Sequence, residues 1–108
     1  MIKIFKSLRA SWRYGKAIRS MRNKRYSDAL VHVNAALALK PEDYMLTLHK
    51  ALKGEIEYEI GNYKESRIIF NGLLNEFERE PDVWQQPKCK ELIERVNWFV
   101  GVLSDKTT

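Results

Sequence analysis

The chain has 108 residues, of which 19 are Lys or Arg and 14 are Asp or Glu, and its formal net charge at pH 7 is +5. This length is typical of one domain, and the single cysteine, Cys89, excludes an internal disulfide and favours a reducing compartment. No apolar run approaches the roughly 18 residues of a membrane span, and charges interrupt the first turns too often for a secretory signal, so we expect a soluble, cytoplasmic protein.

The charge is distributed unevenly along the sequence. Residues 1–25 contain nine of the 19 basic residues and no acidic residue, whereas the other ten basic residues share the rest of the chain with all 14 acidic residues. A basic N-terminal segment therefore precedes a body of net charge −4. Such a field can steer an anionic partner, or the opposite end of a second copy, at moderate salt.

Residues 1–25 are expected to form a basic amphipathic helix. At about 100° per residue, one side carries the apolar residues Ile4, Phe5, Leu8 and Trp12, and the other side carries Lys3, Lys6, Arg9 and Arg13. After Trp12 the apolar stripe moves to Tyr14, Ala17, Ile18 and Met21. The pattern predicts either a bend near Gly15 or two successive contact surfaces.

Four further helices are expected, with boundaries set by proline and glycine. A helix over about 27–39 ends before Pro41, which suits the first turn of the next helix over 41–60. That helix ends at Gly61, a residue type that tolerates the left-handed cap conformation. A fourth helix covers 63–80, the segment 81–88 is expected to be a loop, and a last helix covers 88–103 before a frayed tail over 105–108.

Two segments of the chain repeat one pattern. Residues 25–43 (RYSDALVHVNAALALKPED) align with residues 61–81 (GNYKESRIIFNGLLNEFEREP) when Tyr26 is placed over Tyr63, 37 residues further on. The alignment pairs Ala29 with Ser66, Val33 with Phe70 and Ala36 with Leu73. The segments resemble the second helices of tetratricopeptide repeats, which are helix-turn-helix units of about 34 residues, with about three residues inserted in the second unit.

The resemblance covers about Ala10 to Pro81 and is divergent. Ala17 and Gly54 supply the small residue expected inside each first helix, but Arg13 and Lys50 stand where the family carries a large aromatic residue. It implies an all-α fold of about five helices, antiparallel hairpins stacked as a short solenoid in a single domain over 1–108. This domain would comprise the basic helix 1–25, a repeat core over 26–81 and a capping helix over 88–103. Because about three units are normally needed, the terminal helices or a second chain are expected to cap the stack.

In this family the first helices of successive units line a concave groove that binds a peptide. The corresponding residues here are Tyr14, Ile18, Met21, Arg22, Leu48, Glu55, Tyr58 and Glu59. The alternative is that Tyr14, Ile18 and Met21 belong to the core. The carboxylate clamp of chaperone-binding members needs Lys and Asn where this chain has Tyr14 and Ile18, so a chaperone C-terminus is disfavoured.

No catalytic, metal or cofactor site is predicted. His32 and His49 lie on different predicted helices without a matching Ser or Asp motif, and the sequence has no glycine-rich phosphate loop. Glu55 and Glu59 share a helix face, which is typical of a solvated edge and less often of a metal site. Cys89 lies between two lysines but has no resolving cysteine.

The function expected from the resemblance is non-catalytic recognition of a protein or peptide. One alternative is an immunity or antitoxin-type inhibitor, in which Glu55, Glu57 and Glu59 face a basic nuclease. A second alternative is an adaptor in which the basic helix contacts an anionic membrane surface or a nucleic acid. The simplest alternative for that helix is a solvated cap whose apolar stripe packs on the repeats. A homodimer is also possible, because a second chain could cap the stack.

Overall fold

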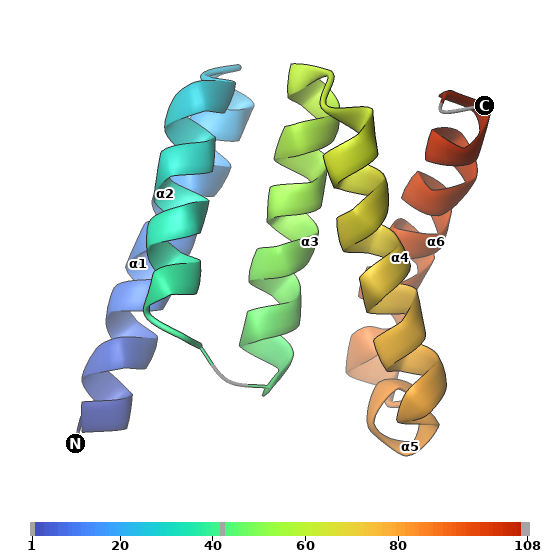
Figure 1. The fold of residues 1–108 in the computed structure, drawn as a ribbon. Coiled ribbons are helices and arrows are strands. Elements are labelled where there is room, and N and C mark those ends of the chain that lie inside the picture. Colours follow the sequence, from blue (N-terminus) through green and yellow to red (C-terminus); the bar gives the residue numbers. More distant parts are fainter. Residues whose placement is uncertain (1, 42, 107–108) are drawn as a thin grey trace.

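Five long helices run alternately up and down in the computed structural model, which describes residues 2–41 and 43–106, without the side chains of 2–7 and 43 (Figure 1). The elements are α1 (Ile2–Arg22), α2 (Tyr26–Ala38), α3 (Asp43–Ile60), α4 (Tyr63–Arg79), α5 (Pro81–Trp84), the 3-10 turn η1 (Pro87–Cys89) and α6 (Lys90–Lys106). The described residues form no strand, so the expected all-α class is confirmed.

The segment 81–88, which we expected to be a loop, is largely helical. Pro81 and Pro87 each occupy the first turn of a short helix, where the fixed proline φ and the missing N–H are compatible with helix initiation. Trp84 is buried beside Phe77, with ring centroids 4.9 Å apart. The last helix begins two residues later than expected and continues to Lys106, past the predicted end at residue 103, while residues 107–108 lie outside the described part.

The two hairpin turns are built in the same way, 37 residues apart. After α1, the Lys24 N–H donates to the Met21 carbonyl at 3.0 Å, and the Arg25 N–H donates to the Ser20 carbonyl at 2.8 Å. After α3, Gly61 donates to Tyr58 at 3.0 Å, and Asn62 donates to Glu57 at 2.8 Å. This pair of bonds closes a helix end through one left-handed residue, which is Lys24 (φ 59°) in the first turn and Gly61 (φ 99°) in the second.

Burial follows the same repeat. The paired positions Ala29 and Ser66, Val33 and Phe70, and Ala36 and Leu73 are all 2% exposed or less. The Ser66 hydroxyl donates to the Gly54 carbonyl at 2.7 Å, which ties α4 to the middle of α3. The sequence alignment therefore identifies equivalent core positions in two equivalent hairpins.

The helices form a thin stack in which α3 is central. The molecule measures 46 × 36 × 19 Å, and its smallest dimension matches two layers of helices, each about 10 Å thick. Leu52 and Ile56 of α3 pack with Ala17, Ala29 and Val33 of the first hairpin. A second core cluster joins Ala51 of α3 to α4 and α6, where the rings of Phe70 and Phe99 stack 4.7 Å apart.

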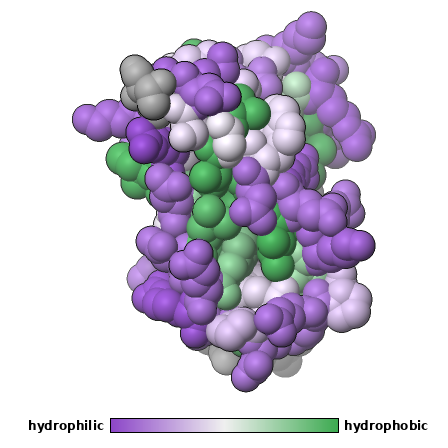
Figure 2. Space-filling model, turned by 90° about the vertical axis from the view of Figure 1, so that its right-hand side faces the viewer, coloured by the Kyte–Doolittle hydropathy of each residue, from purple (hydrophilic) through white to green (hydrophobic). Residues whose placement is uncertain are grey.

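The last helix, α6, extends the stack, and the described residues supply no hairpin partner for it. Helix α6 packs against α4 and also touches α3, as α3 packs against α2 and touches α1. Figure 2 shows an apolar stripe between hydrophilic flanks on the side of the molecule where α4 and α6 lie. Leu74, Ile93 and Val100 are half-buried apolar residues of these two helices. This end of the stack is therefore only partly covered.

Candidate functional site

The first contact of the candidate site joins α1 to α3. The rings of Tyr14 and His49 lie 4.7 Å apart, and His49 is completely buried. Its two ring nitrogens face the carbonyls of Met45 and Ala10, the latter at 3.3 Å. A neutral imidazole has one N–H and so donates to one of these carbonyls at a time. His49 therefore belongs to the packing between α1 and α3.

The second contact joins α3 to α6. The Arg95 guanidinium donates to Glu55 Oε1 at 2.9 Å, and the Glu55 side chain is only 12% exposed whereas that of Arg95 is 54% exposed. Burial raises the pKa of Glu55, Arg95 opposes this rise, and the negative charge of Glu59 adds to it. A mostly buried carboxylate is thus held by one solvent-exposed cation.

Tyr14 belongs to the same cluster. Burial raises the pKa of Tyr14, while the positive charge of Arg95 lowers this pKa and the negative charge of Glu55 raises it. We call Tyr14, Glu55, Glu59 and Arg95 the α1/α3/α6 face. It combines an aromatic hydroxyl, two carboxylates and a guanidinium that come from three helices distant in sequence.

The other residues predicted to line a groove are placed as follows. Tyr14, Ile18 and Met21 are half-buried and all three pack against the core cluster of the first hairpin, whereas Arg22 is exposed at the end of α1. Leu48 is half-buried against the second core cluster. Tyr58 lies between α4 and α6, with ring centroids 5.4 Å from both Tyr63 and Phe99, and so contributes to packing there.

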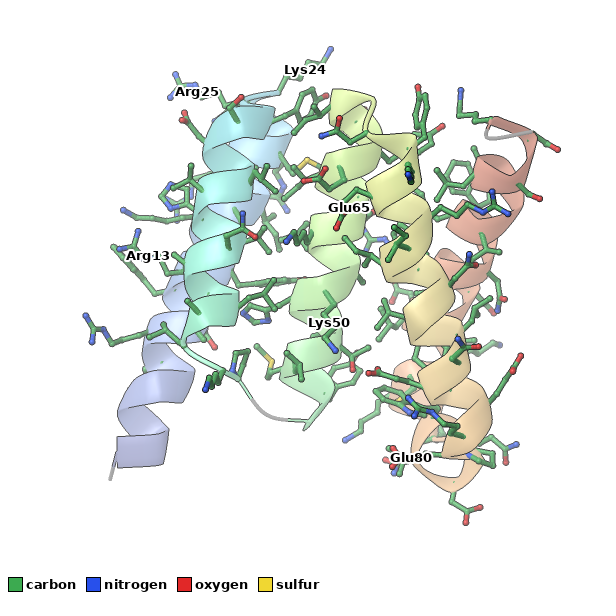
Figure 3. All side chains as sticks on the ribbon, in the orientation of Figure 1. Arg13, Lys24, Arg25, Lys50, Glu65 and Glu80 are labelled. Atoms are coloured by element: carbon green, nitrogen blue, oxygen red, sulfur yellow. The ribbon has the colours of Figure 1, made fainter. Side chains whose placement is uncertain are left out.

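The predicted basic surface is only partly described. Lys3 and Lys6 lie among the residues whose side chains are outside the described part. Arg9 is exposed, and Arg13 is half-buried with one guanidinium nitrogen 3.4 Å from Nδ1 of His32 on α2. Figure 3 shows Arg13, Lys24 and Arg25 on the α1/α2 hairpin, whereas the labelled acids Glu65 and Glu80 lie on the other half of the molecule.

The apolar stripe of the N-terminal helix does not pack on the repeats where it is described. Leu8 is 62% exposed and Trp12 is 56% exposed, whereas Ala10 and Ala17 of the same helix are buried. Helix α1 is continuous through Gly15. The second apolar stripe meets the core, whereas Leu8 and Trp12 of the first stripe are open to solvent.

The acidic patch predicted for a toxin inhibitor is not formed as one surface. Glu57 is buried, and its carboxylate accepts a bond from Asn62 Nδ2 at 2.9 Å, next to the turn that follows α3. Glu55 is bound to Arg95, which leaves Glu59 as the exposed acid of the three. Among the described residues no group of His, Cys, Asp and Glu is arranged to hold a metal ion.

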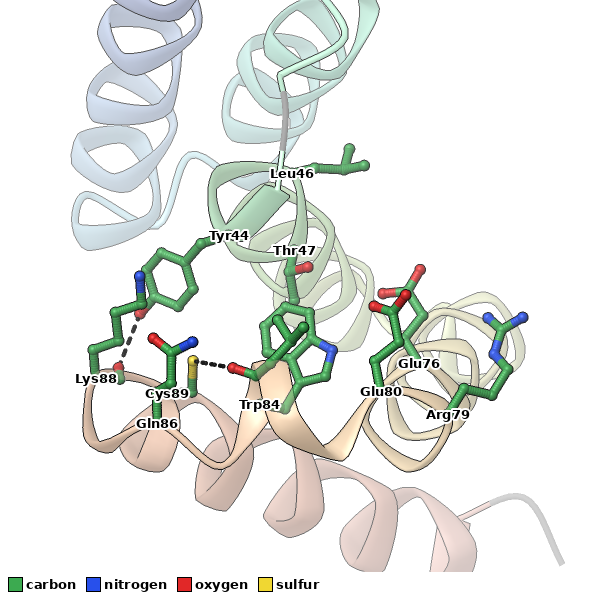
Figure 4. Close-up of a pocket in the computed structure, with 11 residues that line it drawn as sticks. Tyr44, Leu46, Thr47, Glu76, Arg79, Glu80, Trp84, Gln86, Lys88 and Cys89 are labelled. Carbon is green, nitrogen blue, oxygen red and sulfur yellow. Dashed lines mark hydrogen bonds between the residues drawn. The ribbon is translucent and has the colours of Figure 1, made fainter.

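The sequence reasoning missed Arg95 and a cavity at the far end of the stack. The sequence around Arg95 contains no motif that marks it as a site residue. It could have been predicted as one only by treating α6 as the first helix of a third unit. The cavity, of about 680 Å³, is lined by Tyr44, Leu46, Thr47, Glu76, Arg79, Glu80, Val83, Trp84, Gln86, Lys88 and Cys89 (Figure 4). The buried Trp84 N–H has no hydrogen-bond partner among the described residues, and Figure 4 shows its indole nitrogen turned toward Glu80.

Cys89 also lines this cavity but is 1% exposed, and its thiol lies 3.9 Å from the Val83 carbonyl. The structure therefore gives this cysteine a packing role. In the described part of the chain, none of the helices has the length and apolar character needed to cross a membrane. Comparisons of the chain with protein-family models, with curated proteins and with solved structures found no match.

Proposed function

We propose that this chain is a recognition module of the tetratricopeptide-like kind that binds a protein or peptide partner through the α1/α3/α6 face. One observation carries the proposal: an ion pair of 2.9 Å joins Glu55 of α3 to Arg95 of α6, and the charges of both residues act on the pKa of Tyr14 on α1. The repeated hairpins favour this reading, because a stack of such units brings its first helices side by side on one surface.

The chemistry of this face suits a peptide. Arg95 donates to Glu55 at 2.9 Å, and about half of its side chain is open to solvent. A guanidinium has five N–H donors in a planar fork, so further donors remain for a carbonyl or carboxylate of the partner. The half-buried Tyr14 adds an aromatic ring to this face, and the exposed carboxylate of Glu59 can pair with a cation of the partner.

The test is affinity capture with a variant that alters this face without touching the core. The substitution Glu59→Lys reverses the exposed carboxylate of this face. The matched control, Glu78→Lys, reverses an exposed carboxylate on α4 and changes the net charge by the same amount. We expect the wild-type chain and the control to retain one partner that the face variant loses. A partner retained equally by all three chains contradicts the proposal.

A further inference from the structure

Helix α1 has two apolar sides, and only one of them meets the rest of the molecule. Ala10 and Ala17 are 1% and 0% exposed and face the core, whereas Leu8 and Trp12, one helical turn apart, are 62% and 56% exposed. Leu8 and Trp12 therefore form an outer stripe on the described part of α1. A leucine and a tryptophan one turn apart form an exposed apolar strip, and contiguous exposed apolar surface marks interaction sites.

Cations surround this outer stripe. The Lys16 Nζ lies 4.0 Å from the centre of the Trp12 ring, and the Arg13 guanidinium lies 5.1 Å from it. Arg9, Lys16 and Arg19 form no ion pair with any acidic residue whose side chain is described. Their charges are therefore available to an external anion.

Two small clefts beside the outer stripe have no acidic lining residue. One, of about 310 Å³, is lined by Arg9, Trp12, Arg13, Ala35, Ala38 and Leu39. The other, of about 210 Å³, is lined by Lys16, Arg19, Ser20, Asn23, Arg25 and His32. The second cleft gathers three cations with hydroxyl and amide donors, which is a donor set that suits a phosphate group.

We propose that the outer face of α1 docks on a membrane surface that contains anionic lipids. Leu8 and Trp12 enter the headgroup region, where an amphipathic indole is well accommodated, and the flanking cations contact the lipid phosphates. Charge complementarity selects an anionic surface. The apolar stripe distinguishes this occupant from a nucleic acid, because Leu8 gains nothing from a phosphate backbone but is buried by acyl chains.

The experiment is sedimentation of the full chain with vesicles of phosphatidylcholine alone and of phosphatidylcholine mixed with phosphatidylglycerol. Trp12→Ala is compared with Trp98→Ala, which removes an equally exposed tryptophan (59%) from α6. Lys16→Gln with Arg19→Gln is compared with Lys64→Gln and Lys90→Gln, which remove the same charge from α4 and α6. Circular dichroism confirms that each variant is folded.

We expect binding only to the mixed vesicles. Trp12→Ala should weaken partition on the order of tenfold, and each neutralised cation on α1 should weaken it about fivefold, with little change in either control. Equal binding to both vesicle types, or equal losses in a variant and its control, overturns the proposal. Binding to single-stranded RNA in the absence of any vesicle binding overturns it in favour of a nucleic acid.

Discussion

Gly54 is the position at which the packing of the second hairpin is most sensitive to a single methyl group. A Cβ at this position would lie 2.7 Å from two ring carbons of Phe70 and 3.2 Å from a methyl carbon of Ile69. Phe70 cannot turn away easily, because it is fully buried and stacks on Phe99 at 4.7 Å. The equivalent pair in the first hairpin is Ala17 and Val33. There the first helix carries a residue larger than Gly54, and the second helix carries a residue smaller than Phe70.

The expected cost of Gly54→Ala follows from two opposing effects. Overpacking a core costs about 1–3 kcal/mol, and replacing glycine by alanine inside a helix gains about 1 kcal/mol. The free energy of unfolding should therefore fall by about 0–2 kcal/mol. Gly72→Ala is the matched control, because a Cβ in the middle of α4 would meet nothing within 4 Å. This control should gain about 0.5–1 kcal/mol from helix propensity alone.

Urea unfolding followed by circular dichroism measures both variants. We expect Gly54→Ala to be about 1–3 kcal/mol less stable than Gly72→Ala, a difference that corresponds to several degrees in Tm. If Gly54→Ala stabilises the chain as much as Gly72→Ala does, the close crossing of α3 and α4 at Phe70 is not as described, and the packing of the second hairpin must be reconsidered.

Three further predictions concern charge, turns and the buried histidine. Because burial raises the pKa of Glu55 in the folded chain above its ordinary value, its contribution to stability is present below the unfolded-state pKa and is lost as pH rises through the folded-state pKa. In urea unfolding at neutral pH, Glu55→Gln should thus be more stable than the wild type, and this advantage should vanish in acid. Arg95→Ala should lose about 1 kcal/mol of stability at neutral pH. If the advantage of Glu55→Gln is equal at both pH values, the prediction is wrong. Lys24 and Lys40 have φ values of 59° and 52°, so Lys24→Gly and Lys40→Gly should each raise the midpoint of thermal unfolding by relieving up to about 1 kcal/mol of strain, and a lowered midpoint argues against left-handed turns there. His49→Ala removes a fully buried ring between α1 and α3 and should cost about 2–4 kcal/mol in urea unfolding, while the half-buried His32 should cost less when replaced by Ala.

The parts of the fold that sequence predicts are those with local causes. Helical periodicity, Pro41 and Gly61 place the helix boundaries near their observed positions, because these residues restrict or permit particular backbone angles within one turn. The alignment of Tyr26 with Tyr63 identifies equivalent buried positions, since two hairpins of the same geometry need the same spacing of core residues.

The remaining features depend on neighbours that local pattern does not contain. The prolines at residues 81 and 87 predict a loop, yet both begin short helices. The burial of Trp84 stabilises an ordered turn in this segment. Periodicity found both apolar stripes of α1 but could not tell which one meets α2 and α3. Arg95 reaches Glu55 only through the packing of α6, 40 residues further along the chain.

The most direct test of the proposed recognition surface is hydrogen–deuterium exchange of the chain with and without its captured partner. We predict that protection on binding is concentrated in the peptides that carry Tyr14, Glu55 and Arg95, in α1, α3 and α6. Protection confined to α2 and α4, with those three segments unchanged, would contradict recognition through the α1/α3/α6 face.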